Sequence, residues 1–110
     1  MYKQGDIILI PYPFTDLSST KQRPAVVISN AKSNLSMGNY IVAKVTSVIR
    51  KDDFSFDLKN ADLDTSLPKA SQVRTNELFT VSDSIVRKRI ATLKSSSVMR
   101  LIEAVKDNLD

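Results

Sequence analysis

The chain has 110 residues, with 16 lysines and arginines, 12 aspartates and glutamates, and neither cysteine nor histidine. This length leaves room for one compact domain, and a net charge of +4 favours an anionic partner such as nucleic acid. Without cysteine or histidine there is no disulfide, no thiolate nucleophile and no imidazole base, so catalysis would have to use other side chains or backbone groups.

The first half of the chain predicts four short strands. Residues 7–12 and 24–28 are apolar and β-branched, are bounded by turn residues, and are expected to pair antiparallel. Residues 40–47 and 54–58 read as two more strands, separated by a charged, exposed loop at 48–53. The polar segment between the first two strands therefore forms a loop.

The second half predicts shorter elements and then a helix. A polar, turn-like segment at 60–67 precedes a strand at 70–75, shorter strands at 78–80 and 89–93, and a turn at 82–84. Apolar residues then recur at helical spacing from Val98 to Leu109, behind Ser95 or Ser96 as the N-cap. We expect this helix to pack on a small, strongly bent, mainly β structure.

No targeting or membrane signal is expected at the N-terminus. Residues 1–4 lack a basic segment followed by a long apolar run, and Pro11 and Pro13 interrupt the longest apolar stretches. The absence of cysteine also suits a reducing compartment. We therefore expect a cytoplasmic protein that does not enter a membrane.

Arg23 lies at the seam between the first loop and the strand that begins at Pro24. A guanidinium held there by a rigid strand, and directed at whatever the loop covers, is typical of a phosphate-binding cation. The alternative is a surface arginine whose stem covers the edge of the sheet.

Short motifs along the chain together resemble the MazF/PemK family of toxins from type II toxin-antitoxin systems. They are Gly5-Asp6, the RPAVVIS motif at 23–29, the IVAKVTS motif at 41–47 and the ASQVRT motif at 70–75. The resemblance covers nearly the whole chain. It implies one domain over residues 1–110, folded as a small SH3-like barrel of the MazF/PemK/CcdB type with a C-terminal helix.

The resemblance also implies metal-independent, sequence-specific cleavage of single-stranded RNA, with no cofactor. The 2′-hydroxyl attacks the adjacent phosphorus and leaves a cyclic phosphate. Arg23 matches the arginine that stabilises or protonates the phosphoryl group, and Thr46 matches a threonine that donates a hydrogen bond to it. Thr46 could instead serve only β-propensity, and Ser47 would take its part if the register were shifted by one residue.

The general base is where the sequence departs from the family. Some members carry a glutamate shortly before the Arg-Pro pair, but residues 18–22 here read SSTKQ. Asp16 is the nearest carboxylate, and it either acts as base, orients Arg23 or caps its own turn. Ser71 stands where some relatives have aspartate. We therefore expect the arrangement of charge to matter more than proton transfer.

RNA binding needs cations for phosphates and flat side chains for unstacked bases. The two rings of the first loop either stack on bases or fold back as a lid over the core. The expected RNA-binding residues are Tyr12, Phe14, Lys21, Gln22, Lys44, Gln72 and Arg74. The basic run at 87–89 is expected to be a solvated face, and the aspartates at 52–53 and 62–64 to be surface loops without a metal.

By the resemblance, the partners are single-stranded RNA, a second copy of the chain and a cognate antitoxin. RNA would lie in a groove between the subunits, where a disordered acidic tail of the antitoxin could replace it. Two alternatives remain open: a non-catalytic toxin of the same fold that binds a topoisomerase such as gyrase, and an RNA-binding barrel without activity.

Overall fold

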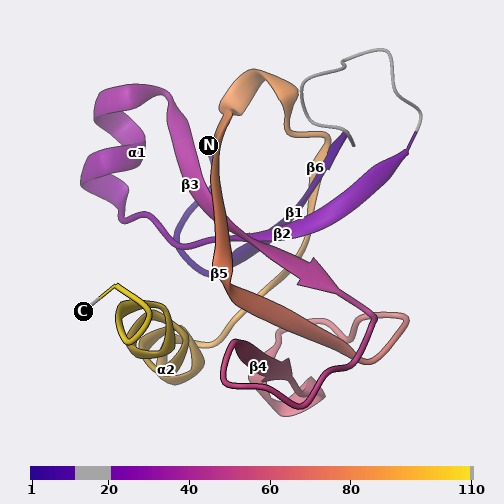
Figure 1. Ribbon diagram of the computed structural model, residues 1–110. Coiled ribbons are helices and arrows are strands. Elements are labelled where there is room, and N and C mark those ends of the chain that lie inside the picture. Colours follow the sequence, from indigo (N-terminus) through magenta and orange to yellow (C-terminus); the bar gives the residue numbers. More distant parts are fainter. Residues whose placement is uncertain (12–20, 110) are drawn as a thin grey trace.

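The computed structural model describes residues 1–11 and 21–109. These residues form one antiparallel sheet in the order β4-β5-β3-β2-β1-β6, with two α-helices (Figure 1). The strands are β1 (Asp6–Pro11), β2 (Gln22–Val27), β3 (Asn39–Thr46), β4 (Ser55–Leu58), β5 (Ser71–Ser82) and β6 (Lys88–Thr92). The helices are α1 (Ala31–Met37) and α2 (Ser95–Lys106), and 3-10 turns lie at Asn60–Asp62 and Asp83–Ile85.

The expected antiparallel pairing of the first two strands is confirmed. β1 pairs with β2 from Ile7 opposite Val26 to Pro11 opposite Gln22. Ile7 is buried in one apolar cluster, and Ile8 and Ile10 are buried in another. Because successive side chains point to opposite faces, β1 is covered on both sides, which explains its unbroken apolar run.

One long strand, β5, replaces the two strands expected at 70–75 and 78–80. It pairs with β3 through Val45 opposite Val73 and again through Ala43 opposite Leu78. Four β5 residues, 74–77, thus stand opposite Lys44 alone, and the strand bends sharply there (Figure 1). The sequence prediction of two strands was wrong because this bend interrupts the alternation within a continuous strand.

The C-terminal helix was predicted, but both of its ends differ: it stops at Lys106, and Leu109, which was expected on its apolar face, lies beyond it and is 69% exposed. α2 begins at Ser95 and its N-cap is Lys94, which makes no capping hydrogen bond through its side chain. The serines instead lie in the first turn, and Ser97 donates its hydroxyl to Asp62. Leu101 and Val105 pack with Ile7 and Val26 in the larger core cluster, so the helix covers one side of the sheet.

The short helix α1 was not expected from the sequence. The Asn30 side chain accepts a hydrogen bond from the Ser33 amide and caps the helix, which ends at Gly38 with a φ of 65°. Asn34, buried inside the helix, bonds to Ser29. The signals were therefore an asparagine and a glycine on either side of a seven-residue helix without an apolar stripe.

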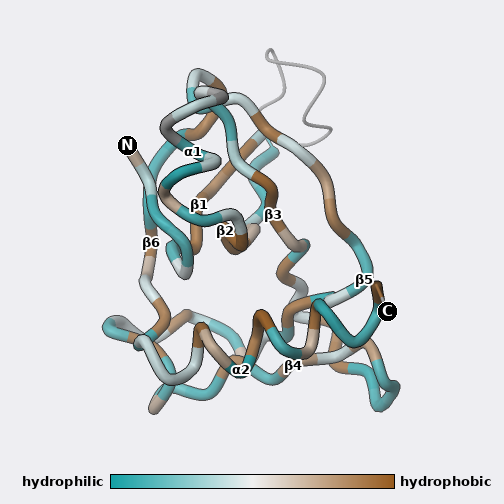
Figure 2. Tube along the Cα trace, turned by 90° about the vertical axis from the view of Figure 1, so that its left-hand side faces the viewer, coloured by the Kyte–Doolittle hydropathy of each residue, from teal (hydrophilic) through white to brown (hydrophobic). Residues whose placement is uncertain are grey.

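The two helices lie at opposite ends of the molecule, with α2 beside β4 (Figure 2). The result is a mainly β half-barrel with a C-terminal helix, as expected. Within residues 1–11 and 21–109, neither helix has the length and apolar character that a bilayer crossing would need.

Candidate functional site

A cavity of about 660 Å³ opens at the point where β2 and β3 separate. The pairing of these strands ends with Ala25 opposite Lys44. Consecutive residues on either side of this opening, 22–24 and 44–48, line the cavity, together with Leu9 of β1 and residues of segment 66–71 and β6. The seam that the sequence singled out thus borders a real concavity.

Arg23 and Thr46 border this opening from two neighbouring strands. Continuing the pairing of Ala25 with Lys44 by two residues would set Arg23 across from Thr46. Residues that are paired, or two apart on one strand, share a face, so Arg23, Lys44 and Thr46 belong to one side, whereas Ser47 lies in a bend just beyond the end of β3. The register therefore favours Thr46 over Ser47 as the companion of Arg23, although both line the cavity.

The hydroxyl of Thr46 is fixed by the backbone that follows it. Its Oγ1 accepts a hydrogen bond from the Val48 amide at 3.1 Å. A hydroxyl has one proton and two acceptor lone pairs, so this contact leaves the Thr46 proton available for a phosphoryl oxygen. Arg23 is exposed, and one of its Nη atoms donates to the Gln22 carbonyl at 3.3 Å.

The charged residues that line the cavity in the described part of the chain are all basic. Arg23, Lys44, Lys69 and Lys88 line it, and none of the lining residues in the described part of the chain is acidic. Lys44 has a partner at the rim, because its Nζ lies 3.7 Å from Glu77 Oε1 with both side chains half exposed. Such a surface pair contributes only about 0 to 1 kcal/mol, so a phosphate can compete for the lysine.

Sequence reasoning missed Lys69 and Lys88. Lys88 belongs to the basic run that was expected to be a solvated face, yet it lines the cavity. Leu9 pairs with Pro24 on one side and with Lys88 on the other, so β1 carries Lys88 to within one strand of the Arg23 seam. No local pattern could have revealed this, because the pairing joins distant parts of the chain.

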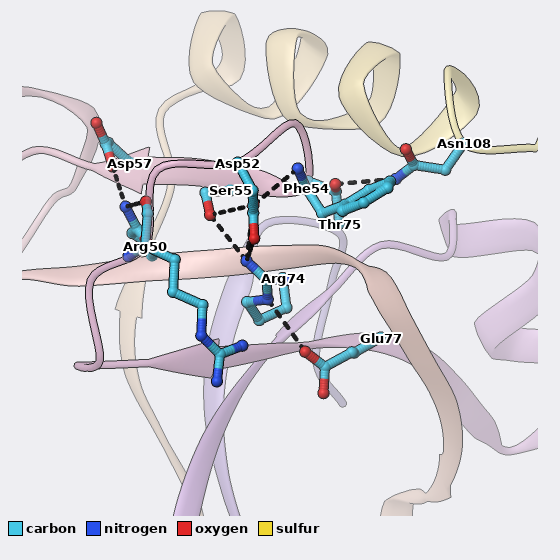
Figure 3. A network of polar contacts seen from close by, with 10 residues as sticks. Arg50, Asp52, Phe54, Ser55, Asp57, Arg74, Thr75, Glu77 and Asn108 are labelled. Atoms are coloured by element: carbon cyan, nitrogen blue, oxygen red, sulfur yellow. Dashed lines mark hydrogen bonds and ion pairs between the residues drawn. The ribbon is translucent and has the colours of Figure 1, made fainter.

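Gln72 and Arg74, both expected to bind RNA, do not line the cavity. They are 3% and 5% exposed. Arg74 contacts Asp52, Ser55 and Glu77 (Figure 3). Gln72 bonds to the backbone of Arg50 and to Asp57. Both side chains are thus occupied by hydrogen bonds within the protein. A role for them in RNA binding stays a prediction.

Comparison with known families gives a match over almost the whole chain. The model of PemK-like, MazF-like toxins of type II toxin-antitoxin systems matches residues 3–109. The chain belongs to this toxin family. Comparison of this PemK-like toxin with curated proteins finds no match.

Solved structures of similar toxins share the fold. An endoribonuclease from a Mycobacterial species, in complex with its cognate antitoxin, is 15% identical with a TM-score of 0.78, covering 99% of this chain and 95% of its own. A MazE-MazF structure from Deinococcus radiodurans is 17% identical with a TM-score of 0.76, covering 98% and 94%. The toxin MazF-mt6 of Mycobacterium tuberculosis is 20% identical with a TM-score of 0.74, covering 96% of each chain.

Of the remaining expected site residues, two lie in the described part of the chain and three do not. Gln22 lines the cavity of this PemK-like toxin, whereas Lys21 is exposed outside its lining. Tyr12, Phe14 and Asp16 lie outside the described residues.

Two of the aspartates considered as metal ligands, Asp52 and Asp62, accept hydrogen bonds from the protein itself. A hydrogen bond from Arg74, helped by one from Ser55, lowers the pKa of the Asp52 carboxyl to about 2. Burial raises the pKa of Asp62, but hydrogen bonds from Ser97, Lys59 and Arg100 outweigh it and leave the pKa below its ordinary value. Within the described residues, no three acidic side chains gather as a metal site would require.

Proposed function

We propose that this toxin is a metal-independent endoribonuclease that cuts single-stranded RNA at specific sequences. The observation that carries the proposal is the cavity at the β2–β3 separation, which has Arg23, Thr46 and further cations around it and no acidic residue among its described lining. A phosphodiester gathers negative charge on its phosphoryl oxygens during cleavage, and fixed donors aimed at that charge would supply most of the acceleration.

The proposed reaction is an internal transfer within the RNA. The 2′-oxygen forms a bond to phosphorus while the bond from phosphorus to the 5′-oxygen breaks, giving a 2′,3′-cyclic phosphate and a 5′-hydroxyl. The 2′-hydroxyl proton leaves to a base, and the departing 5′-oxygen gains a proton. Arg23 stabilises or protonates the phosphoryl group, and Thr46 donates a hydrogen bond to it. Ser47 is the alternative hydroxyl, and Asp16 is the candidate base or the group that orients Arg23.

The cavity also supports a path for the RNA backbone. Lys44, Lys69 and Lys88 would contact phosphates on either side of the one that is cut, and Gln22 offers an amide for a base edge. Lys21 would extend the path beyond the cavity, and Tyr12 and Phe14 are the proposed stacking platforms. Gln72 and Arg74 are left out of this path because their side chains are buried and paired.

The proposed protein partners are a second copy of the chain and a cognate antitoxin. The Mycobacterial relative is described as bound to its cognate antitoxin, and the Deinococcus radiodurans relative as a MazE-MazF structure. A cation-lined cavity suits an acidic antitoxin segment that competes with RNA. The proposed place of action is the cytoplasm, where the RNA substrate occurs.

The test is cleavage of a long single-stranded RNA by the purified toxin, without antitoxin and in EDTA. We expect cuts at a short recurring sequence, with cyclic phosphate and 5′-hydroxyl ends. An RNA with a 2′-deoxy sugar at the cut site is the matched control and should stay intact, because it lacks the attacking oxygen. Cuts in the deoxy control, or cleavage only after divalent metal is added, would contradict the proposed chemistry.

The two alternatives from the sequence make different predictions in the same experiment. A toxin that binds a topoisomerase would leave RNA intact and copurify with gyrase. An inactive RNA-binding barrel would bind the RNA with a strong salt dependence and never cut it. The absence of acidic side chains from the described cavity lining keeps the second alternative in view.

A further inference from the structure

Segment 47–54 joins β3 to β4 and borders the cavity with its first two residues, Ser47 and Val48. Its large apolar side chains are turned outward: Val48 is 59% exposed, Ile49 54% and Phe54 39%. Burial of these side chains therefore does little to hold the segment in place. Polar contacts from β5 hold it instead.

The first contact is a side-chain clamp on the backbone of Arg50. Gln72 Oε1 accepts a hydrogen bond from the Arg50 amide at 2.9 Å, and Gln72 Nε2 donates to the Arg50 carbonyl at 2.9 Å. The second proton of Nε2 goes to Asp57 Oδ1 at 2.8 Å. Both donors and the acceptor of this carboxamide are thus used, so the buried side chain has one defined orientation.

Arg74 provides the second contact, two residues further along the same strand (Figure 3). It donates to Asp52 Oδ1 at 3.0 Å and to Ser55 Oγ at 2.8 Å, and its Nε donates to Glu77 Oε2 at 3.1 Å. Asp52 in turn accepts from the Phe54 amide at 3.0 Å. Because residues two apart on a strand share a face, Gln72 and Arg74 bind successive parts of segment 47–54.

The Gln72 clamp lies next to the candidate threonine. Thr46 pairs with Gln72, and Gln72 pairs with Asp57, so one row of the sheet runs from the cavity to the clamp. Thr46 Oγ1 receives the Val48 amide, and Val48 stands two residues before the clamped Arg50. The path of the loop therefore decides whether the Val48 amide meets the Thr46 hydroxyl.

We propose that Gln72 is a positioning residue for RNA cleavage: by fixing the Arg50 backbone it holds the Val48 amide on Thr46 and so directs the Thr46 proton toward the bound phosphate. Gln72 itself does not touch the RNA. This inference rests on the proposed function and reassigns Gln72, which the sequence had suggested as an RNA ligand.

The experiment compares wild type with Gln72→Leu, Gln72→Glu and the double variant Gln72→Glu/Asp57→Asn, measuring kcat and KM on a short RNA substrate. Gln72→Leu keeps the bulk of the side chain and loses the clamp. In Gln72→Glu the new carboxylate meets the Asp57 carboxylate, and Asp57→Asn then supplies a donor to it. We expect both single variants to lower kcat by about 10- to 100-fold. KM should stay within about twofold, and the double variant should recover part of kcat.

Gln4→Leu is the matched control for a purely structural role. Gln4 also ties its amide to the backbone, donating to the Ile28 carbonyl at 2.8 Å, but it does not line the cavity. Gln4→Leu should lower the melting temperature and leave kcat unchanged. Equal kcat for Gln72→Leu and wild type would overturn the proposal, and so would a raised KM with unchanged kcat, which would indicate a direct RNA ligand.

Amide hydrogen exchange separates this inference from the proposed function. If wild type cuts no RNA, the proposed function fails, but the clamp can still be measured. The amides of Val48 and Arg50 should exchange faster in Gln72→Leu than in wild type, and at the wild-type rate in Gln4→Leu. If both amides exchange at the wild-type rate in Gln72→Leu, the proposal that Gln72 fixes the Arg50 backbone is wrong, whatever the activity.

Discussion

Two residues on neighbouring strands carry the proposed chemistry at the residue scale. Arg23 supplies a permanent charge, and Thr46 supplies a hydroxyl that the Val48 amide orients. Neither a guanidinium nor a hydroxyl is a base that would accept the 2′-hydroxyl proton. Stabilisation of the transition state by fixed donors therefore bears most of the proposed acceleration.

The choice between Thr46 and Ser47 can be tested directly. Thr46→Val keeps the shape of the side chain and removes its proton, so we expect kcat for RNA cleavage to fall by about 10²- to 10³-fold. Ser47→Ala should change kcat by less than about threefold, because Ser47 lies beyond the end of β3 and outside the register that sets Arg23 across from Thr46. The reverse order of effects would assign the role to Ser47.

Gly5 is a residue-scale requirement for the fold. Its φ is 95°, and a Cβ there would lie 2.7 Å from Val98 Cγ2 on α2. Gly5→Ala should therefore lower the free energy of unfolding by about 1–3 kcal/mol, measured by urea titration. Gly38→Ala is the control, since it has a φ of 65° in open space and should cost about 1 kcal/mol. Equal effects would mean that the contact with α2 is unimportant.

At the scale of elements, the sequence predicted what depends on neighbouring residues and missed what depends on distant pairing. The β1–β2 pair and the Arg23 seam follow from a local pattern of apolar runs and turn residues. From the sequence alone, Arg74 was expected to be an RNA-binding cation. The fold brings Asp52 and Glu77 into contact with it, and it forms ion pairs with both. Lys88 was expected to lie on a solvated face, but the pairing of β6 with β1 places it at the cavity.

One buried carboxylate, Asp62, adds polar contacts to the apolar packing that holds α2 on the sheet. Asp62 accepts hydrogen bonds from Ser97 at 2.8 Å and from Arg100 at 2.6 Å, both on α2, and from the Lys59 amide at 3.0 Å. Asp62→Asn cannot accept all of these, so we expect it to lose about 1–3 kcal/mol of stability at pH 7. Asp53→Asn, an exposed change, should stay within about 0.5 kcal/mol.

Asp62→Asn should also make the free energy of unfolding less dependent on pH in the acid range. The pKa of Asp62 is lowered in the folded state, so its contribution is complete above the unfolded value of about 3.9 and is lost as pH falls through the folded value. The gap between wild type and Asp62→Asn in urea titrations should therefore narrow below about pH 4. A constant gap from pH 7 to pH 2 would mean that the carboxylate charge plays no part.

For the whole molecule, the distribution of charge matters more than the net charge of +4. Arg23, Lys44, Lys69 and Lys88 gather at one cavity, whereas other basic side chains such as Arg74, Arg89 and Arg100 are paired with aspartates. The composition could suggest an anionic partner, but only the fold shows where such a partner would bind.

Salt dependence measures this concentration of charge. If Lys88 contacts a phosphate, Lys88→Ala should reduce the slope of log K against log salt for a non-cleavable single-stranded RNA by about 0.7. Lys106→Ala is the control, because that exposed lysine pairs with Glu103 on α2 and does not line the cavity. An unchanged slope for Lys88→Ala would show that Lys88 does not contact an RNA phosphate, and the proposed RNA path would then not include β6.

The proposed ribonuclease activity and the role of Arg23 are tested most directly by comparing wild type, Arg23→Ala and Arg89→Ala on a long single-stranded RNA in EDTA, with the fragment ends mapped. Arg89 is the matched control, since it is bound to Asp64 and lies outside the cavity lining. We expect cuts at a short recurring sequence by wild type and Arg89→Ala, and their loss in folded Arg23→Ala. Intact RNA with wild type, or unchanged cleavage by Arg23→Ala, would contradict the proposal.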